Sequence, residues 1–390
     1  MKGSVGKFLS IKKIPIQRIQ RIQRKAITMH KRRTFIKKTG LLLGGISILP
    51  QYAFKPSFQK QKLGVCLVGL GNYSATQLAP ALQLTEHCEL RGIVTGSPEK
   101  IPVWQKKYGI PDKNVYNYEN MTGITNNPDI DVIYIVLPTG LHSEYAIKAA
   151  NTGKHVWCEK PMAKTAEECQ AIIDACSKNK VKLSIGYRMQ HEPNTQKIIE
   201  WSKTKPFGEI EKLRADIGWN MTDPPDTWRM DAELGGGMIY DVGVYCINAM
   251  RYTTGLEPVS VTGRNENSRP EIFKEVAEVT SFEFDFPEGI RANGKTTAAE
   301  NINILRSDCE NGWYELSPFQ AYNGVQGKAS DGTLLNTYIE NQQARQMDDD
   351  ALAILKNRPV MVPGEEGIKD IIIVEAINES AKTGKTIKLS

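Results

Sequence analysis

A glycine-containing turn between a strand-like run and a helix-like segment constrains the fold of this chain most strongly. Residues Leu63–Val68 read as a buried strand, Gly69-Leu70-Gly71-Asn72-Tyr73-Ser74 follows at once, and Thr76–Leu84 predicts a helix. The first glycine permits a tight turn, and the second lets the backbone approach a pyrophosphate at the helix N-terminus. Ser74 stands where the usual pattern has a third glycine, so the match is imperfect. The context nevertheless predicts a dinucleotide-binding unit that begins at residue 63.

Strand-like and helix-like segments alternate from residue 63 to residue 186. Further strands are expected at Cys88–Val94, Val132–Leu137, His155–Cys158 and Lys182–Ile185, with helices at 98–108, 143–151 and 165–179. This alternation indicates a doubly wound parallel sheet of the Rossmann type over residues 63–186.

The pattern changes in the second half of the chain. Longer alternating runs occur at 210–219, 259–264, 276–286 and 289–298, with helices expected at 194–204, 342–356 and 368–383. Alternation of this kind is typical of antiparallel strands that have one buried face. We therefore expect residues 187–390 to form an α+β domain with a large, mostly antiparallel sheet that serves substrate binding and oligomerisation.

The N-terminal segment has the sequence pattern of an export signal, with a solvated basic arm as the simpler interpretation. The run Lys31-Arg32-Arg33-Thr34-Phe35-Ile36-Lys37 precedes the apolar stretch Leu41–Leu49, which is shorter than the ~20 residues of a membrane span. We expect residues 1–53 to be a twin-arginine signal region read by the twin-arginine export machinery. The mature protein would then be periplasmic, with an uncleaved membrane anchor and a start at Met29 as open alternatives.

Charge and cysteine usage agree with that interpretation. Residues 1–39 hold 13 Lys and Arg and no acidic residue, so the rest of the chain has a formal charge of −7 and offers no basic face for nucleic acid. The seven cysteines are odd in number and lack metal-ligand spacing. We expect them to be buried thiols, and we expect no metal site.

The end of the second predicted strand bears on the choice of cofactor. An enzyme that binds NAD usually has Asp or Glu there, whereas this chain has Thr95 followed by Gly96 and Ser97. Thr95, Ser97 and Lys100 could donate hydrogen bonds to a 2′-phosphate. This pattern favours NADP, with NAD as the alternative and with Lys100 as the start of a solvated helix as the simpler interpretation.

Three further stretches identify a family resemblance. Glu159-Lys160-Pro161 closes a predicted strand, Gly186-Tyr187-Arg188 closes the next, and Gly235-Gly236-Gly237-Met238-Ile239-Tyr240-Asp241-Val242-Gly243-Val244-Tyr245 follows. In this order they resemble the Gfo/Idh/MocA oxidoreductases, and most of all the glucose–fructose oxidoreductase branch. The resemblance implies that Lys160, Asp241 and Tyr245 line the site beside the nicotinamide. It also implies a homodimer or homotetramer formed through the exposed face of the second sheet.

The residue types suit the chemistry of sugar oxidation. Such a reaction sends a hydride to the nicotinamide and a proton to a base. A free tyrosine has a pKa near ~10, and a nearby ammonium favours the phenolate, so Tyr245 with Lys160 makes a candidate base. Asp241 lies four residues before Tyr245, on the same helical face, where it could position Lys160 or a sugar hydroxyl. A helix cap is the simpler role for Asp241.

Other candidates rest on position alone. Leu137, Pro138 and His142 follow a predicted strand at the edge where cofactors bind, and His142 as a helix cap is the slightly favoured alternative. Glu159 and Arg188 are assigned to the cofactor site, with a structural ion pair as the alternative for Arg188. Trp228 and Arg229 precede the glycine run and are candidate sugar contacts, although a packed Trp228 is equally compatible.

These features together predict an exported, NADP-dependent sugar oxidoreductase. In the glucose–fructose type the cofactor stays bound while one sugar is oxidised and another is reduced. That type carries a long arm after its leader, whereas only Gln51–Gln61 separates the leader from the first strand here. A dehydrogenase or redox-assisted lyase or hydrolase acting on glycosides is therefore the alternative, and a non-catalytic, cofactor-bound binding protein is the second.

Overall fold

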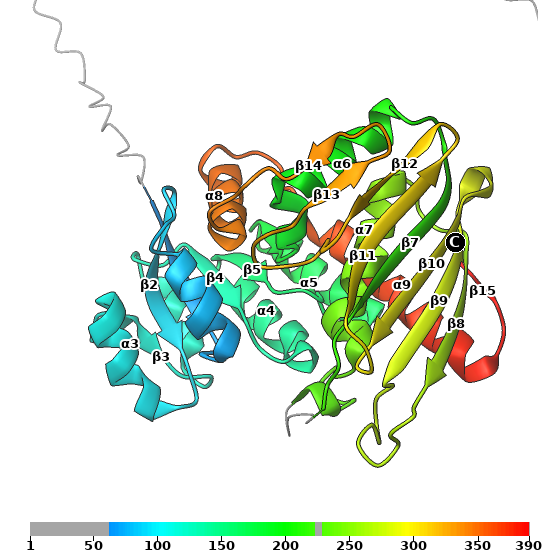
Figure 1. The fold of residues 1–390 in the computed structure, drawn as a ribbon. Coiled ribbons are helices and arrows are strands. Elements are labelled where there is room, and N and C mark those ends of the chain that lie inside the picture. The colour runs from blue at the N-terminus through cyan, green and yellow to red at the C-terminus, as the bar shows by residue number, and fades with distance from the viewer. Residues whose placement is uncertain (1–61, 223–227, 390) are drawn as a thin grey trace, which may run out of the picture. The chain divides into compact units, whose positions relative to one another are not determined.

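The computed structural model describes residues 62–222 and 228–389 (Figure 1). The predicted signal region, residues 1–53, lies outside the described residues. No helix in the described ranges is long and apolar enough to cross a membrane. The described chain forms two sheets with helices packed between and around them.

The first sheet has six strands, all parallel, as the alternating pattern predicts. Their order is β3-β2-β1-β4-β5-β6, so the order reverses between β1 and β4. Ligands of such sheets bind at the carboxyl ends of the strands near this reversal. The strands are β1 Leu63–Val68, β2 Cys88–Val94, β3 Val115–Tyr116, β4 Val132–Ile135, β5 His155–Cys158 and β6 Leu183–Ile185.

Helices α3 Ile101–Tyr108, α4 His142–Asn151 and α5 Ala166–Lys178 lie close to their predicted positions. The start of α5 is fixed by a capping box, in which the Thr165 side chain accepts from Glu168 N–H and Glu168 accepts from Thr165 N–H. The single helix predicted at Thr76–Leu84 is not regular. A π-helical turn, Ser74–Leu78, precedes a short α2, Ala79–Ala81. Pro80 has no N–H for the i−4 carbonyl, which disfavours a continuous α-helix there.

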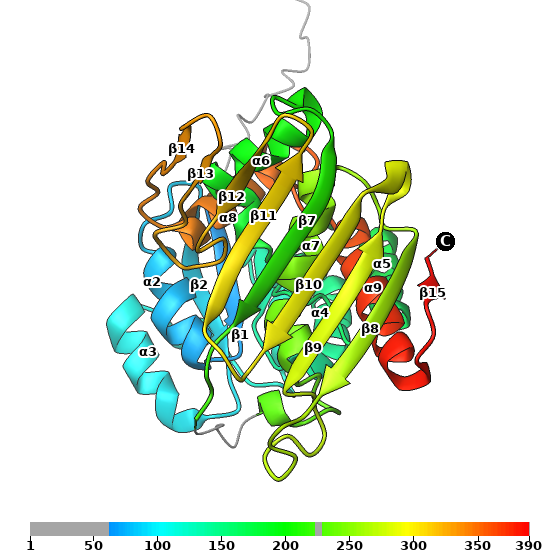
Figure 2. The same cartoon turned by 45° about the vertical axis from the view of Figure 1, so that its right-hand side comes forward.

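The second sheet has nine strands in the order β14-β13-β12-β11-β7-β10-β9-β8-β15 (Figure 2). Each neighbouring pair is antiparallel except β7 with β10, so the predicted mostly antiparallel sheet is confirmed. The strands are β7 Ile210–Gly218, β8 Ser260–Glu266, β9 Val279–Asp285, β10 Arg291–Thr297, β11 Ile302–Cys309, β12 Gly312–Leu316, β13 Gly327–Ala329, β14 Leu334–Leu335 and β15 Ile387–Lys388.

The sequence pattern does not predict strands β11 to β14, because few of their inward positions carry large apolar side chains. In β11 the inward positions are Leu305, Ser307 and Cys309, and two of these three are small side chains. The central strand β7 was found because Leu213, Ala215 and Ile217 are buried at every second position. A period of two is therefore informative only where the inward side chains are apolar.

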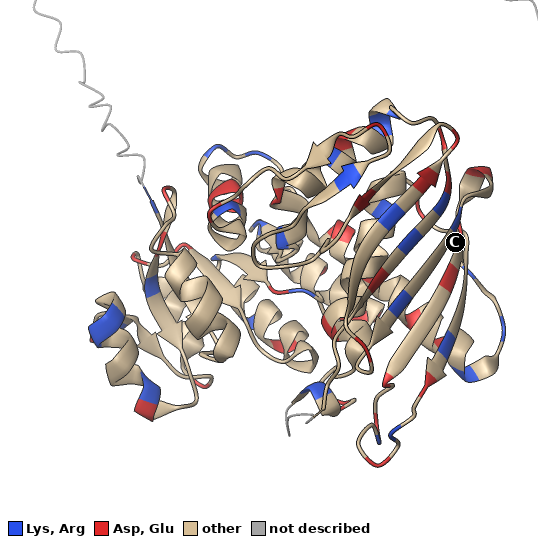
Figure 3. Cartoon of the chain, in the orientation of Figure 1, with Lys and Arg blue, Asp and Glu red and all other residues tan. Residues whose placement is uncertain are grey.

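One face of the second sheet is covered by helices and the other is charged (Figures 2 and 3). The packed helices are α6 Pro193–Thr204, α7 Val244–Thr254 and α9 Gly364–Thr383. On the other face, Arg214 pairs with Asp216 at 2.6 Å within β7, and Arg306 pairs with Asp308 and Glu315 at 2.9 and 3.0 Å. This face therefore carries ionic side chains of both signs.

Helix α8, Gln342–Leu355, returns from the second half of the chain to the first sheet. Its residues Ala344, Met347 and Ala351 pack into the core around β1 and β2. The Asp348 carboxylate accepts hydrogen bonds from the backbone N–H groups of Glu86 and His87 at 3.0 and 2.8 Å. Helix α8 therefore lies far from β1 in sequence but closes the core beside it.

All seven cysteines are free and buried, as expected from their number and context. They are Cys66, Cys88, Cys158, Cys169, Cys176, Cys246 and Cys309. Burial raises the pKa of the Cys309 thiol to about 11 and that of the Cys176 thiol to about 12. These thiols contribute to packing and are held in the neutral form.

Candidate active site

The loop after β1 has the shape that a pyrophosphate requires. Gly69 adopts φ +95°, and a Cβ added there would lie 2.3 Å from the Val136 carbonyl oxygen. A Cβ on Gly71 would meet nothing within 4 Å, so the backbone there is open on that side. Ser74, in place of the third glycine, donates from Oγ to the Gly69 carbonyl at 2.6 Å and holds the loop closed. The residues present therefore fit a dinucleotide cofactor.

The residues proposed to choose between NAD and NADP lie at the end of β2. Lys100 Nζ donates to the Leu70 carbonyl at 3.0 Å, so this lysine reaches the phosphate loop. Thr95 is buried and its Oγ1 accepts from Ser97 N–H at 3.0 Å, while Gly96 packs against the Tyr118 ring. An ammonium has three donors, so Lys100 keeps two beyond this bond.

The loop after β4 lies against the phosphate loop. Leu137 Cδ2 is 2.8 Å from the position that a Cβ on Gly69 would take, and Pro138 comes next in the chain. The buried His142 ring contacts the carbonyls of Leu137 and Pro161, each at 2.8 Å. Helix α4 has Leu141 at its N-cap position and no side-chain cap, so the capping role favoured for His142 is wrong. The ring instead joins the loops after β4 and β5.

Burial and the two carbonyl contacts act on the pKa of His142 in opposite directions. Enclosure of the ring lowers its pKa, and this effect outweighs the carbonyl contacts that favour the imidazolium. The ring is 1% exposed and both nitrogens face the protein interior. His142 therefore holds the loops after β4 and β5 in place from the interior of the protein.

Glu159 is a buried carboxylate behind the site. Tyr134 on β4 donates to its Oε1 at 2.6 Å. Burial raises the pKa of Glu159, although Tyr134, Lys160 and Arg188 act in the opposite direction. A side chain on Gly186 would clash with this carboxylate, since its Cβ would lie 2.8 Å from Oε1. This explains why glycine opens the Gly186-Tyr187-Arg188 stretch.

Lys160, Asp241 and Tyr245 come together as the sequence predicts. Lys160 follows β5, and its Nζ donates to the Asp241 carbonyl at 2.7 Å and lies 3.7 Å from Asp241 Oδ1. The same Nζ is 4.8 Å from the centroid of the Tyr245 ring. Asp241 belongs to a π-helical turn, Ile239–Gly243, and Tyr245 to the start of α7. The two residues share one face although the helix between them is not regular.

Asp241 is an ion-pair partner of two cations. Arg229 Nε donates to its Oδ2 at 2.7 Å, on the side away from Lys160. Burial opposes ionisation of the carboxyl, but Lys160 and Arg229 outweigh it and hold the pKa of Asp241 below its ordinary value. The turn that contains Asp241 has no side-chain cap, so the alternative role of helix cap is wrong.

The glycine run brings Arg229 to this place. Gly237 N–H donates to the Arg229 carbonyl at 2.8 Å, and a Cβ on Gly236 would lie 2.5 Å from the same oxygen. Trp228 is half-buried, and the Arg229 guanidinium lies 4.6 Å from its ring centroid. A small recess adjoins Asp241 and is lined by Arg229, Met238, Phe273 and Val276, among others.

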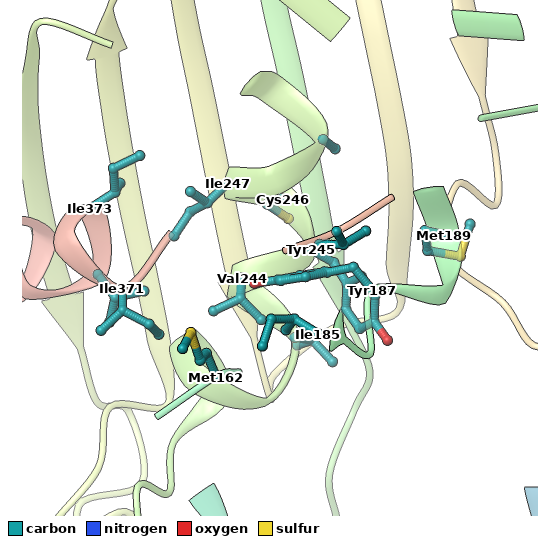
Figure 4. Close-up of a cluster of buried hydrophobic side chains, with 14 of the residues drawn as sticks. Met162, Ile185, Tyr187, Met189, Val244, Tyr245, Cys246, Ile247, Ile371 and Ile373 are labelled. Atoms are coloured by element: carbon teal, nitrogen blue, oxygen red, sulfur yellow. The ribbon is translucent and has the colours of Figure 1, made fainter. Parts of the chain in front are cut away.

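The structure places further aromatic residues around Tyr245 and the phosphate loop, and Tyr322 among them was not predicted from the sequence. Tyr187 meets Tyr245 edge-on at 6.1 Å between ring centroids, in the cluster of Figure 4 that also holds Met162 and Ile185. Tyr322, from the loop between β12 and β13, stacks on Tyr73 of the phosphate loop at 6.0 Å. Tyr322 sits in an irregular segment, where no periodicity marks a residue as functional.

Two family models match this chain. Residues 63–187 match the model described as "Oxidoreductase family, NAD-binding Rossmann fold", and residues 195–308 match the "GFO/IDH/MocA C-terminal domain". An aldose-aldose oxidoreductase from Caulobacter crescentus is 36% identical, with a TM-score of 0.81 over 84% of this chain and 100% of that chain. The chain belongs to the Gfo/Idh/MocA oxidoreductase family.

Other similar proteins are less identical to this chain. The D-xylose 1-dehydrogenase [NADP(+)] of Haloarcula marismortui is 28% identical over 343 residues, which are 83% of this chain and 92% of that protein. An oxidoreductase domain protein from Kribbella flavida is 18% identical with a TM-score of 0.72, over 85% of this chain and 100% of that chain, and shows the fold alone. The Gfo/Idh/MocA resemblance inferred from the motifs is thereby confirmed.

Proposed function

We propose that this protein is an NADP-dependent sugar oxidoreductase in which Tyr245 exchanges a proton with the reacting sugar hydroxyl. The observation that carries the proposal is the meeting of Lys160, Asp241 and Tyr245 at the carboxyl edge of the first sheet. This edge also carries the glycine loop whose backbone fits a pyrophosphate. The proton-exchanging group thus lies beside the place for the cofactor.

The described residues divide the work between them. When bound, NADP supplies the hydride acceptor. Tyr245 takes the hydroxyl proton, and the Lys160 ammonium stabilises the phenolate electrostatically. Asp241 and its partner Arg229 hold Lys160 in place through the 2.7 and 3.7 Å contacts. In the reverse direction Tyr245 returns the proton to a sugar carbonyl.

Two observations support NADP as the cofactor. Thr95 stands where an acidic residue would meet the hydroxyls of NAD, and Lys100 lies within reach of the phosphate loop. The D-xylose 1-dehydrogenase relative is also named for NADP(+). NAD remains the alternative, because the enzyme family includes both preferences in the names of its members.

We further propose that the protein runs a two-sugar cycle in which the cofactor stays bound. The aldose-aldose oxidoreductase relative, 36% identical, supports this choice by its name. The D-xylose dehydrogenase relative supports the second candidate, a dehydrogenase that exchanges its cofactor in each turnover. The short segment Gln51–Gln61 after the leader also favours that second candidate.

Nucleotide content separates these candidates. The protein is purified without added nucleotide, denatured, and the released nucleotide is identified and counted per subunit. About one NADP per subunit, together with oxidation of one aldose that depends on a second aldose as acceptor, supports the two-sugar cycle. Empty protein that reduces added NADP with a single aldose supports the exchanging dehydrogenase. NADP-loaded protein inert toward all aldoses would contradict both.

Export and assembly are separate proposals. Replacement of Arg32 and Arg33 by lysine should keep the protein in the cytoplasm when fractions are compared with the unaltered chain.

We also propose a homodimer or homotetramer formed through the charged face of the second sheet. Reversal of charge at Arg214 and Arg306 together should shift the protein to monomers in sedimentation analysis, and an unchanged oligomer would place the interface elsewhere.

A further inference from the structure

Arg188 is a buried cation whose role none of the site contacts above explains. It begins a 3-10 turn, Arg188–His191, directly after β6, and it is 0% exposed. Its Nη1 donates to the Ala321 carbonyl at 2.9 Å and to Gln342 Oε1, and contacts Met189 Sδ at 2.9 Å. Among the described residues, no carboxylate lies within ion-pair distance of it, and Nε and Nη2 have no hydrogen-bond partner.

A charge in this state is costly unless something nearby compensates it. Burial without an anionic partner strongly disfavours the charged guanidinium, and two N–H groups without hydrogen-bond partners add to the free-energy cost of burial. Even so, the pKa of Arg188 is raised, because burial acts to lower it but the surrounding Tyr245, Tyr73, Tyr322 and Glu159 outweigh burial. The charge of Arg188 is therefore coupled electrostatically to groups that line the active site.

The guanidinium lies between two tyrosine rings. Its Cζ is 5.6 Å from the centroid of Tyr245 and 4.8 Å from the centroid of Tyr322. Lys160 Nζ approaches Tyr245 at 4.8 Å from another segment of the chain. Tyr245 is thus the one described tyrosine that has both a lysine and an arginine over its ring.

We propose that Arg188 is a positioning residue that stabilises Tyr245 as the phenolate, so that two cations rather than Lys160 alone prepare this residue to take the sugar proton. The proposal rests on the role of Tyr245 as proton acceptor. It moves Arg188 from the cofactor contacts, where its motif placed it, to the electrostatics of the proton step. In this step the hydroxyl proton passes to the Tyr245 oxygen, and it leaves this oxygen when the product is released or a carbonyl is reduced.

The other charges near Tyr245 show why a second cation matters. Lys160 is partly neutralised by Asp241 at 3.7 Å. Glu159 lies near Arg188, but its carboxyl accepts from Tyr134 and its own burial raises its pKa. The remaining neighbours of Tyr245 are the phenols of Tyr73, Tyr187 and Tyr322, which are neutral. Arg188 therefore supplies positive charge that no ion pair cancels.

The test is the pH dependence of sugar oxidation in charge variants of Arg188. In Arg188→Met, kcat/KM with NADP and an aldose should fall about tenfold or more at neutral pH and recover toward the wild-type value in alkaline solution. The reason is that the Tyr245 phenolate is less favourable at neutral pH once the adjacent cation is removed. Arg188→Lys keeps the charge and should retain most of the neutral-pH rate. Arg345→Met removes an exposed arginine from α8 and should leave the profile unchanged.

A second variant keeps the test valid if Arg188→Met does not fold. Gln342→Glu places a carboxylate on the partner of Arg188 Nη1, so the guanidinium stays but its charge is cancelled. This variant should move the acidic side of the pH profile of kcat/KM to higher pH, as Arg188→Met does. A uniform loss of rate with an unchanged profile in both folded variants would overturn the proposal for Arg188.

One parallel variant separates this failure from failure of the proposed function. Tyr245→Phe should lose activity at every pH and show no rescue in alkaline solution. If Tyr245→Phe stays active, Tyr245 is not the proton acceptor and the function assigned to this cluster fails. If Tyr245→Phe is inactive but Arg188→Met has the wild-type profile, only the inference about Arg188 fails.

Discussion

The two ends of the candidate active site are built from different parts of the chain. At the phosphate loop, backbone geometry fits the site to its ligand: Gly69 and Gly71 act by lacking a side chain. Around Tyr245, charged side chains do so: Lys160 and Arg188 approach its ring from two segments, and Arg229 pairs with Asp241 from a third. The first end should therefore be intolerant of added atoms, and the second should be intolerant of altered charge.

The largest effect is expected at the charged end. Tyr245→Phe removes the group that exchanges the proton but keeps the ring and its contacts, so turnover should fall about 10²–10⁴-fold. Nucleotide content and thermal stability should stay near those of the wild type, which fluorescence titration and calorimetry can check. A turnover within threefold of the wild type would show that another residue exchanges the proton.

The phosphate-loop end is tested by two alanine substitutions. Gly69→Ala brings a Cβ to 2.3 Å from the Val136 oxygen at φ +95°, so it should destabilise the fold by roughly 1–3 kcal/mol and reduce nucleotide content more than tenfold. Gly71→Ala meets no protein atom within 4 Å, so it should keep its unfolding temperature yet also lose nucleotide.

The difference between these two variants is the informative result. Equal nucleotide binding in wild type and Gly71→Ala, measured by equilibrium dialysis, would mean that the pyrophosphate does not pass over Gly71. An unaltered unfolding temperature in Gly69→Ala would contradict the close approach of this loop to Val136.

Asp241→Asn tests the ion pairs at the charged end. The carboxylate has a lowered pKa in the folded protein, so its pairing with Lys160 and Arg229 stabilises the fold above its ordinary pKa of ~3.9 and is lost as the pH falls below it. Asp241→Asn should be less stable by roughly 1–3 kcal/mol at neutral pH. Denaturant unfolding should show this gap closing below about pH 4, and a gap that persists in acid would indicate a packing defect instead.

The smallest effect is expected for cofactor choice. Lys100→Met removes one charged donor near the phosphate loop and should weaken NADP binding about three- to tenfold, with little change for NAD. Lys106→Met, on the exposed side of α3, is the matched control and should change neither affinity. A proportional loss for both nucleotides would assign Lys100 to the loop itself rather than to the 2′-phosphate.

The sequence predicted the backbone-built end more completely than the charged end. Strand β1, the turn at Gly69 and the alternation up to β6 follow from local patterns, and the structure has them within a few residues. At the charged end, sequence motifs predict Lys160, Asp241 and Tyr245. No motif marks Tyr322 or Gln342, because these residues lie in segments that only the tertiary fold brings next to Arg188.

The errors have local physical causes. The capping role favoured for His142 assumed an exposed helix start, whereas the ring is buried between two loop carbonyls. The regular helix expected at 76–84 gave way to a π-helical turn because Pro80 cannot donate a backbone hydrogen bond.

The return of α8 to the first sheet has a consequence for how the protein is made. Residues 344–351 close the core beside β1 and β2, and Gln342 anchors Arg188, yet they are synthesised long after the last strand of the first sheet. Domains generally fold in order of synthesis from the ribosome. In this protein the nucleotide-binding half leaves part of its apolar surface open until α8 has emerged, so its maturation waits for the synthesis of the second sheet.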